Sequence, residues 1–244
     1  MKIGLITVSY NSEKTIRDTL ESVRKQTHKP HEYIIIDGLS TDNTLEIVKE
    51  YSDIVTKVIS EKDKGIYDAM NKGIKNIKSD IIALLNSDDT YTDSNVFKDV
   101  LSGFKMGYKV VCGGVNYTNF DGEIKRKWNL REYPGTFKYG WHPPHPSFFA
   151  SINLYNKLRH FNLNYPIAAD FDLMFRFIEV DNNSPLIINR PLVNMKLGGE
   201  SNKSFRNIFN GNAEIRKSLN AGNINVSYIY TLRRLFFKYL QKFI

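Results

Sequence analysis

Short apolar segments alternate with longer amphipathic segments over the first 90 residues. The candidate strands are residues 3–8, 33–36, 55–59 and 81–86, and the candidate helices between them are residues 13–25, 43–51 and 66–77. The strand at 81–86 begins with five apolar residues in a row, which is typical of a strand buried on both faces. Strands that alternate with helices build a parallel sheet covered by helices on both faces, so the pattern predicts an α/β fold.

Beyond residue 90 the segments become shorter and more varied. The sequence NFDG at 119–122 lies between two candidate strands and predicts a β-hairpin with Asp-Gly in its turn. The sequence HPPHP at 142–146 holds too much proline for a helix or a central strand, so we expect a shaped loop there. The expected helices are residues 95–105 and 170–178, and the expected strands are residues 109–115, 115–118, 123–128, 185–189 and 191–196.

Composition narrows the class of protein. The chain has 244 residues, of which 41% are hydrophobic and 25% charged, as in a soluble globular protein with one α/β domain. Its start, MKIGLITVSYNSEKT, turns polar too soon for a signal peptide, and no apolar run approaches the roughly 18 residues of a membrane-spanning helix. The single cysteine, Cys112, excludes an internal disulfide and lies in an apolar segment. We therefore expect a cytoplasmic protein with Cys112 in its core.

The net charge of +8 is concentrated near the end of the sequence. Residues 201–244 hold eight Lys and Arg residues against one acid, Glu214. In residues 225–244, apolar and aromatic side chains recur at helical spacing and most basic ones fall off that stripe, as in helices that lie on an anionic membrane surface. A C-terminal helix packed on the domain is the alternative. The first 200 residues are nearly neutral and contain no motif that reads bases, so we expect no nucleic-acid partner.

Two adjacent carboxylates, Asp88 and Asp89, follow the apolar strand at 81–86. Neighbouring anions at the end of a buried strand repel each other and resist desolvation, unless a cation lies between them. Carboxylate oxygens are the ligands that Mg²⁺ and Mn²⁺ prefer, and such ions often also hold substrate phosphates. The alternative is an ordinary polar turn.

Polar side chains end two other predicted strands. Ser9 and Asn11 follow the first strand and Asp37 ends the second. Because ligands bind at the carboxyl ends of parallel strands, three such ends on one sheet edge predict a binding site. The sequence has no GxGxxG motif after its first strand and no GxxxxGK[ST] motif, which argues against a dinucleotide oxidoreductase and a P-loop NTPase.

Asp170 lies at the start of the predicted helix at 170–178. It could cap that helix, or it could act as a general base that takes a proton from an attacking alcohol. His142 and His145, in the proline-rich loop, could be metal or acceptor ligands or simply polar loop residues. Gly198 and Gly199 form a hinge that could close over a substrate or only turn the chain.

Several of these segments, in this order, resemble the inverting glycosyltransferases of family 2, which have the GT-A fold. The resemblance covers residues 1–201 and is greatest to the enzymes of colanic-acid, capsule and O-antigen assembly. The segments that carry it are TVSYN at 7–11, IDGLSTDNT at 36–44, EKDKGIYDAMNKG at 61–73, LNSDD at 85–89, ADFDL at 169–173 and GGES at 198–201.

The resemblance implies a role for each matching position. Asp89 would bind a divalent Mn²⁺ or Mg²⁺ ion, Asp88 would share the metal or bind the ribose or sugar, and Asp170 would be the general base, with Asp172 in reserve. The family often has Glu-Asp where this chain has Ala169-Asp170, and the first position of its DxD motif is Asn86 here. The remaining positions that would line the nucleotide-sugar site are Thr7, Ser9, Asn11, Asp37, Asp42, Asp63, Gly65, Asn71 and Asn86, and those on the acceptor side are His142, His145, Asp172 and Gly199.

These roles predict a metal-assisted single displacement that moves a sugar from a UDP- or GDP-sugar to a hydroxyl of a saccharide, with the acceptor linked to a lipid, in bacterial surface polysaccharide synthesis. We expect residues 1–90 to bind the nucleotide sugar, residues 91–201 to form the acceptor side, and residues 202–244 to be a basic tail that packs on the domain or binds the inner face of the membrane. A catalytically silent sugar-nucleotide-binding protein is the alternative function.

Overall fold

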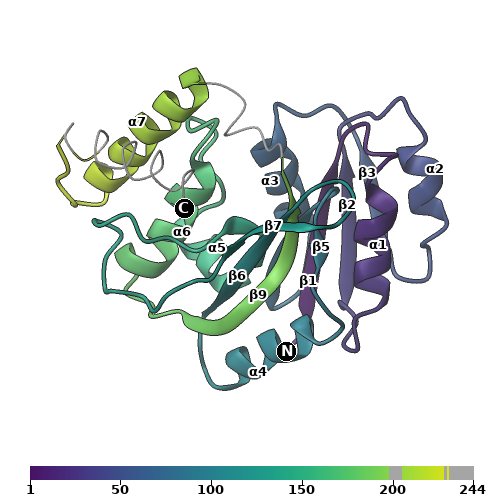
Figure 1. Ribbon diagram of the computed structural model, residues 1–244, viewed down its shortest axis with the longest axis horizontal. Coiled ribbons are helices and arrows are strands. Elements are labelled where there is room, and N and C mark those ends of the chain that lie inside the picture. Colours follow the sequence, from purple (N-terminus) through teal and green to yellow (C-terminus); the bar gives the residue numbers. More distant parts are fainter. Residues whose placement is uncertain (198–204, 228–229, 231–244) are drawn as a thin grey trace.

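A computed structural model describes residues 1–197, 205–227 and 230. Its described strands form one nine-stranded mixed sheet in the order β3-β2-β1-β4-β8-β6-β9-β5, and β7 pairs with β6 (Figure 1). The first half of the sheet is parallel, as predicted, with β1 between β2 and β4. These four strands are β1 (Ile3–Ser9), β2 (Glu32–Asp37), β3 (Lys57–Ser60) and β4 (Ile81–Asn86).

The second half of the sheet is mixed. β8 pairs antiparallel with both β4 and β6, so it joins the two halves, while β6 pairs parallel with β9. The predicted hairpin is confirmed, because β6 and β7 pair antiparallel across residues 119–123. The strands of this half are β5 (Thr90–Tyr91), β6 (Val110–Thr118), β7 (Ile124–Trp128), β8 (Phe148–Ser151) and β9 (Leu186–Lys196).

Helices cover both faces of the sheet and produce two apolar cores. One face packs side chains such as Ile6 and Ile36 under α3, and the other packs Leu5 and Ile35 under α1 and α4. Cys112 is completely buried in the first core, as predicted. The helical elements are α1 (Ile16–Arg24), α2 (Thr44–Lys49), α3 (Ile66–Asn76), α4 (Val96–Lys105), η1 (His145–Ser147), α5 (Ile152–Leu158), α6 (Ala169–Phe175), η2 (Arg176–Val180) and α7 (Phe205–Ala221).

Three details of the predicted pattern are wrong. The two strands expected at 185–189 and 191–196 are one strand, β9, whose register against β6 shifts at Gly113 and Gly114. Such an irregularity lets Pro191, which has no N–H to donate, remain within the strand. The short strands β5 and β8 and helix α5 were not predicted. Helix α2 ends at Lys49 rather than Tyr51.

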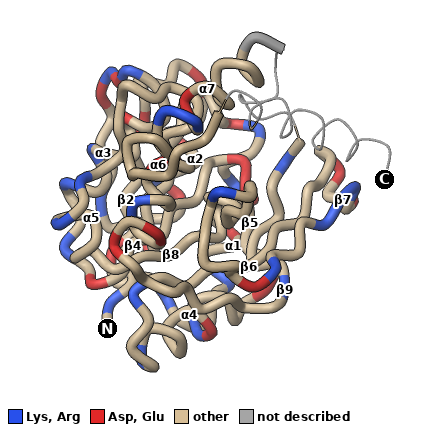
Figure 2. The backbone as a smooth tube through the Cα atoms, turned by 90° about the vertical axis from the view of Figure 1, so that its left-hand side faces the viewer, with Lys and Arg blue, Asp and Glu red and all other residues tan. Residues whose placement is uncertain are grey.

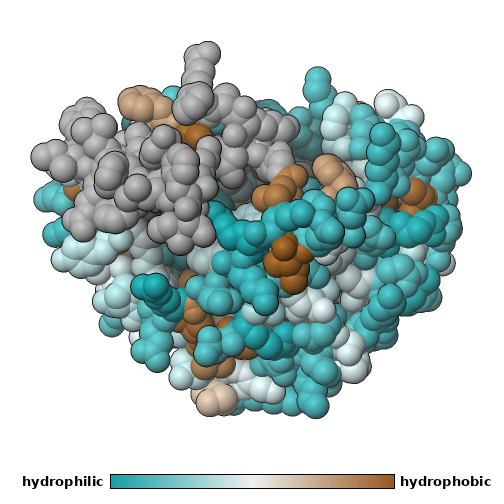
Figure 3. Space-filling view, in the orientation of Figure 1, coloured by the Kyte–Doolittle hydropathy of each residue, from teal (hydrophilic) through white to brown (hydrophobic). Residues whose placement is uncertain are grey.

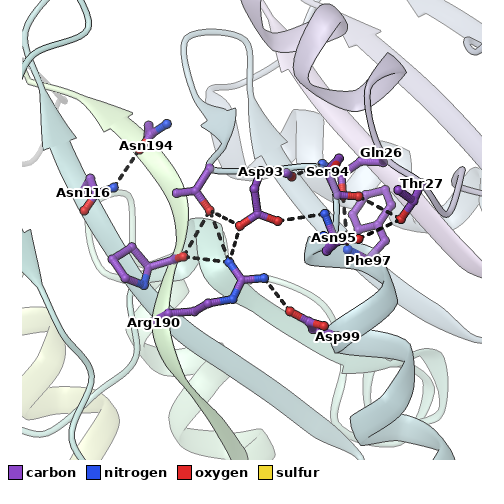
Figure 4. A network of polar contacts seen from close by, with 12 residues as sticks. Gln26, Thr27, Asp93, Ser94, Asn95, Phe97, Asp99, Asn116, Arg190 and Asn194 are labelled. Carbon is purple, nitrogen blue, oxygen red and sulfur yellow. Dashed lines mark hydrogen bonds and ion pairs between the residues drawn. The ribbon is translucent and has the colours of Figure 1, made fainter.

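Arg190 fastens β9 to the connection between β5 and α4 (Figure 4). Its guanidinium donates hydrogen bonds to the carboxylates of Asp93 (2.6 Å) and Asp99 (2.5 Å). The Asp93 carboxylate also accepts a bond from the Asn95 N–H, and the Gln26 side chain donates to the Asp93 carbonyl oxygen. These contacts hold β9 against the start of α4.

Helix α7 packs beside α6, away from the parallel half of the sheet (Figure 1). The face seen in Figure 3 is mostly hydrophilic with separate apolar patches, which fits a chain whose large side chains are mostly in its cores. The backbone at β7 is largely blue in Figure 2, the colour of Lys and Arg residues. Lys125, Arg126 and Lys127 of this strand are exposed. Within the described residues, no helix has the length and apolar character needed to cross a membrane.

Candidate active site

The end of β4 holds two buried oxygen atoms that lack a hydrogen-bond partner. Asp89 is 1% exposed, and one of its carboxylate oxygens accepts a bond of 3.1 Å from the Asn86 side-chain amide. Its other oxygen, Oδ1, and Oδ1 of Asn86 are buried and have no partner. Buried polar atoms normally find one, so this pair indicates that a group outside the chain completes the site.

The pKa shifts of Asp88 and Asp89 also indicate that a group outside the chain binds here. Burial, followed by the neighbouring Asp88, raises the pKa of Asp89 well above its usual range, although the Asn86 bond opposes the shift. Burial also raises the pKa of Asp88, against a smaller opposing effect of the Lys196 cation. Both groups therefore resist ionisation in the free chain, and a bound cation would reverse this by favouring the charged forms.

The donor set suits a hard divalent ion that is shared with a ligand. Asp88, Asp89 and Asn86 offer carboxylate and amide oxygens, which Mg²⁺ and Mn²⁺ prefer. Among residues 1–197 and the described part of α7, no group of three or more His, Cys, Asp or Glu side chains could hold a metal alone. Such a site fits an ion that takes its remaining ligands from substrate phosphates and water.

A cavity of about 260 Å³ opens beside Asp88. Lys196, at the end of β9, lines it, and its ammonium lies 3.5 Å from the Asp18 carboxylate and 5.9 Å from the centre of the Phe120 ring. The strand pairing of Thr90 with Asn194 brings this end of β9 alongside the carboxylate pair. The sequence did not predict Lys196 as a site residue, because this strand pairing joins segments that are about 100 residues apart.

The ends of β1, β2 and β3 form a polar row at the same edge. Ser9 pairs with Asp37 and Asp37 pairs with Ser60 in the parallel register. The completely buried Asp37 carboxylate accepts hydrogen bonds from the hydroxyls of Ser9 (3.1 Å), Ser60 (2.8 Å) and Ser40 (2.5 Å) and from the Ser40 N–H (2.9 Å). These four donors hold the loop after β2 against the end of β1.

Asn11 and Asp42 fasten the same loop to the start of α1. Asn11, which has a left-handed φ of 48°, accepts a bond from the Thr41 N–H through its side chain. Asp42 accepts bonds from the Thr44 N–H and hydroxyl and from the Glu13 N–H. Burial raises the pKa of Asp42, but these hydrogen bonds together outweigh that effect, so the pKa lies below its usual value.

Ser12 and Ser87 link the loops after β1 and β4. Their hydroxyl groups lie 2.8 Å apart, although the two residues are 75 positions apart in the sequence. This contact joins the polar row to the Asp88-Asp89 loop. Neither serine was predicted as a site residue, since serines in polar loops carry no periodic signal.

The remaining predicted donor-side residues lie at three different places. The Asp63 carboxylate accepts a hydrogen bond of 2.8 Å from the Gly65 N–H. It also lies close to Gly38, where an added Cβ atom would be 2.7 Å from an Asp63 carboxylate oxygen. Gly65, with φ of 111°, is the N-cap of α3. Thr7 is completely buried within β1 and its hydroxyl contacts the Tyr33 hydroxyl. Of these, Asp63 adjoins the polar row, whereas Thr7 lies in the core beneath it.

Asn71 does not extend toward the polar row. Its side-chain amide donates to the Phe161 carbonyl oxygen (3.0 Å) and its side-chain oxygen accepts from the Phe161 N–H (2.9 Å). Asn71 is buried, at 8% exposure. It therefore clamps the backbone at Phe161 onto helix α3.

Asp170 lies in the first turn of α6, near the N-terminal end of α3. The helix begins at Ala169 with Ala168 as its N-cap, so Asp170 does not occupy the N-cap position considered for it, although its carboxylate binds an N–H group of the first turn. One Asp170 carboxylate oxygen accepts bonds from the Tyr67 hydroxyl (3.1 Å) and the Phe171 N–H (2.8 Å). Burial, and next the Asp170 charge, raise the pKa of Tyr67 well above its usual range, so this hydroxyl stays protonated and donates.

The two histidines of the proline-rich loop have different surroundings. The His145 ring packs edge-on against Phe161, and its Nε2 atom is buried without a hydrogen-bond partner. Burial lowers the pKa of His145, with a smaller opposing effect of Asp170, so the ring is neutral. His142 packs edge-on against Trp128 and Phe171. Asp170 thus interacts electrostatically with His145.

Asp172 points into the interface with α7 rather than toward Tyr67. Its carboxylate binds the Arg176 guanidinium (2.8 Å) and accepts a bond from the Ser218 hydroxyl (2.7 Å). Both oxygens are engaged, which favours Asp170 over Asp172 as the base. Gly199, the other predicted acceptor-side residue, lies outside the residues that the structure describes.

Known proteins resemble this chain in sequence. The profile of the family described as "Glycosyl transferase family 2" matches residues 5–178. The putative teichuronic acid biosynthesis glycosyltransferase TuaG of Bacillus subtilis is 35% identical over 101 residues, which are 40% of each chain. The PGL/p-HBAD biosynthesis glycosyltransferase of Mycobacterium bovis is 25% identical over 197 residues, 77% of this chain and 72% of that protein.

Solved structures show the same fold. TarS 1–349 of S. aureus, in complex with UDP-GlcNAc, superposes with a TM-score of 0.72 at 18% identity, covering 95% of this chain and 69% of that one. The mannosyltransferase PcManGT of Pyrobaculum calidifontis, in complex with GDP-Man and Mn²⁺, gives a TM-score of 0.65 at 14% identity, covering 93% and 65%. The chain has the GT-A fold and belongs to glycosyl transferase family 2.

Proposed function

We propose that this protein is an inverting glycosyltransferase that moves a sugar from a UDP- or GDP-sugar to a hydroxyl of a saccharide. The observation that carries the proposal is the pair of unpartnered buried oxygens of Asn86 and Asp89 beside Asp88, at the carboxyl edge of the parallel strands. The UDP-GlcNAc and the GDP-Man with Mn²⁺ bound to the two similar structures support a nucleotide-sugar donor and a metal.

In this reaction the acceptor hydroxyl attacks the anomeric carbon while its proton passes to the Asp170 carboxylate. The bond between the anomeric carbon and the diphosphate oxygen breaks as the new bond forms, so a single displacement inverts the configuration. Asp88, Asp89 and Asn86 would hold the divalent ion, which would stabilise the negative charge that develops on the departing diphosphate. Tyr67 orients the base through its 3.1 Å hydrogen bond.

We further propose that Ser9, Asn11, Asp37 and Asp42, at the ends of the parallel strands, shape the pocket for the base and ribose. Residues 1–90 would then bind the donor, and residues 91–201 would bind the acceptor. The names of the relatives, which refer to teichuronic acid and PGL/p-HBAD biosynthesis, support a role in the synthesis of a surface saccharide. We propose in addition that the saccharide acceptor is linked to a lipid.

The basic segment 225–244 supports peripheral binding to the inner face of the cytoplasmic membrane. Sedimentation of the full chain with vesicles of anionic phosphatidylglycerol, compared with neutral phosphatidylcholine, tests this. Equal sedimentation with both kinds of vesicle would contradict electrostatic attraction to the membrane.

Turnover separates the enzyme from a silent nucleotide-binding protein. With Mn²⁺ and water as acceptor, the native chain should release UDP from UDP-GlcNAc or GDP from GDP-mannose, and Asp170→Asn should lower the rate about 100-fold. Its affinity for the nucleotide should stay within about twofold, since Asp170 lies away from the donor row. Binding of a donor without any release of nucleotide would overturn the catalytic proposal.

A further inference from the structure

Two helices that are far apart in the sequence, α3 and α7, form hydrogen bonds to the turn that leads into α6. The hydroxyl of Tyr67, in α3, lies 3.1 Å from the Ile167 carbonyl oxygen and 3.1 Å from the Asp170 carboxylate, so its single hydrogen is shared between these two acceptors. Glu214, in α7, accepts bonds from the N–H groups of Ile167 (3.0 Å) and Ala168 (2.8 Å) through one carboxylate oxygen. The dipeptide just before the helix that carries Asp170 is therefore held on both sides.

Glu214 is the only acidic residue among residues 201–244, and it is not on the surface. Its exposure is 9%, and the neighbouring Ala168 is 4% exposed. Burying a carboxylate costs free energy unless hydrogen bonds compensate, and here the two backbone N–H groups do so. Of the two, the N–H of Ala168 belongs to the N-cap of α6, which no backbone carbonyl within the helix can accept.

Close packing sets this carboxylate in place. Gly211, one turn before Glu214 in α7, faces Ile167 so closely that a Cβ there would lie 2.9 Å from the Ile167 side chain. One turn after Glu214, Ser218 donates its hydroxyl hydrogen to Asp172. Three successive turns of α7 thus contact the first residues of α6 and the turn before it.

We propose that Glu214 is a positioning residue for the general base: by holding the N–H groups of Ile167 and Ala168, it fixes the first turn of α6 and thereby the Asp170 carboxylate. This inference rests on the proposed role of Asp170 and extends it to a helix that lies beyond residue 178, where the family match ends. The active site of this chain then includes α7.

Variants of Glu214 test the proposal on the full-length chain. Glu214→Ala removes the acceptor, whereas Glu214→Gln keeps one side-chain oxygen that can receive both N–H groups. Ser218→Ala is the matched control, because it removes a hydrogen bond between the same two helices without touching the turn before α6. Asp170→Asn is measured alongside to test the base itself.

Two readouts distinguish positioning from general support of the fold. In Glu214→Ala, amide hydrogen exchange at Ile167 and Ala168 should accelerate at least about tenfold. The kcat for UDP-GlcNAc or GDP-mannose hydrolysis should fall roughly 10- to 100-fold, because small displacements of a reacting group are costly. The KM for the donor and the affinity for UDP or GDP with Mn²⁺ should stay within about twofold, which also shows that the variant is folded.

Glu214→Gln should recover kcat to within about threefold of the native value, and Ser218→Ala should stay within about twofold. A native kcat in Glu214→Ala, or an equal loss in Ser218→Ala or Glu214→Gln, would overturn the proposal. The base assignment fails separately: a native rate in Asp170→Asn would reject it, whatever the exchange at Ile167 and Ala168 shows.

Discussion

Replacement of Asn71 by Ala separates a structural role from a binding role. The resemblance of residues 61–73 to the family implies that Asn71 belongs to the nucleotide-sugar site, whereas its side chain bonds to both backbone groups of Phe161. If the clamp is its function, Asn71→Ala should lower the free energy of unfolding and leave nucleotide affinity unchanged.

The size of the effect follows from the two groups left without partners. An unsatisfied buried N–H or carbonyl group costs about 1–3 kcal/mol, so the pair costs about 2–6 kcal/mol. Alanine regains about 0.5 kcal/mol of helix propensity in α3. The net loss of about 1.5–5.5 kcal/mol corresponds to a fall in Tm of about 3–22 °C for a chain of this size.

Urea unfolding followed by circular dichroism measures this loss, and calorimetric titration with UDP and GDP measures binding. Asn76→Ala is the matched control, since Asn76 is the last residue of the same helix and is only partly buried. It should change the free energy of unfolding by less than about 1 kcal/mol. Native stability in Asn71→Ala, together with lost nucleotide binding, would refute the clamp and restore the binding role.

Two further predictions concern the carboxylate pair and the packing of α3. Because burial raises the pKa of Asp89 in the folded chain, the carboxyl of the unfolded chain ionises first, at its ordinary pKa of 3.8, and the contribution of Asp89 to the stability of the metal-free protein should fall as the pH rises above that value. Thermal unfolding across pH should therefore show that Asp89→Asn gains stability relative to the native chain as the pH rises; equal pH slopes in the two proteins would contradict it. Gly73→Ala would put a Cβ 2.4 Å from the Ile6 side chain, so it should lower the free energy of unfolding, measured in urea, by about 1–3 kcal/mol. An unchanged free energy of unfolding would show that β1 and α3 can move apart without loss of stability.

The parallel half of the fold was predictable because its signals are local and periodic. The apolar strands at 3–8 and 81–86 and the amphipathic helices between them determine a parallel sheet, and parallel strands bring their carboxyl ends to one edge. That rule alone is enough to bring Ser9, Asp37 and the Asp88-Asp89 loop to the same edge of the sheet.

The mixed half depends on pairings that no local pattern encodes. The two residues of β5 pair with β9 about 100 positions later, and β8 has four residues. The same holds for single contacts, since Asn71 bonds to Phe161 and Glu214 bonds to Ile167 only because distant helices pack together. Residue types predicted Asp170 as a base, but only the structure shows Tyr67 and Glu214 beside its helix.

The central claim is that a divalent cation and a nucleoside diphosphate bind together at the end of β4. Calorimetric titration with UDP and GDP, with and without Mn²⁺, on the native chain and on Asp89→Ala tests it most directly. Asp93→Ala is the control, because Asp93 lies four residues later and pairs with Arg190 instead. We expect one nucleotide to bind the native and control chains only with Mn²⁺, and Asp89→Ala to bind neither nucleotide. Metal-dependent binding that survives in Asp89→Ala, or no binding to the native chain under any condition, would contradict the account.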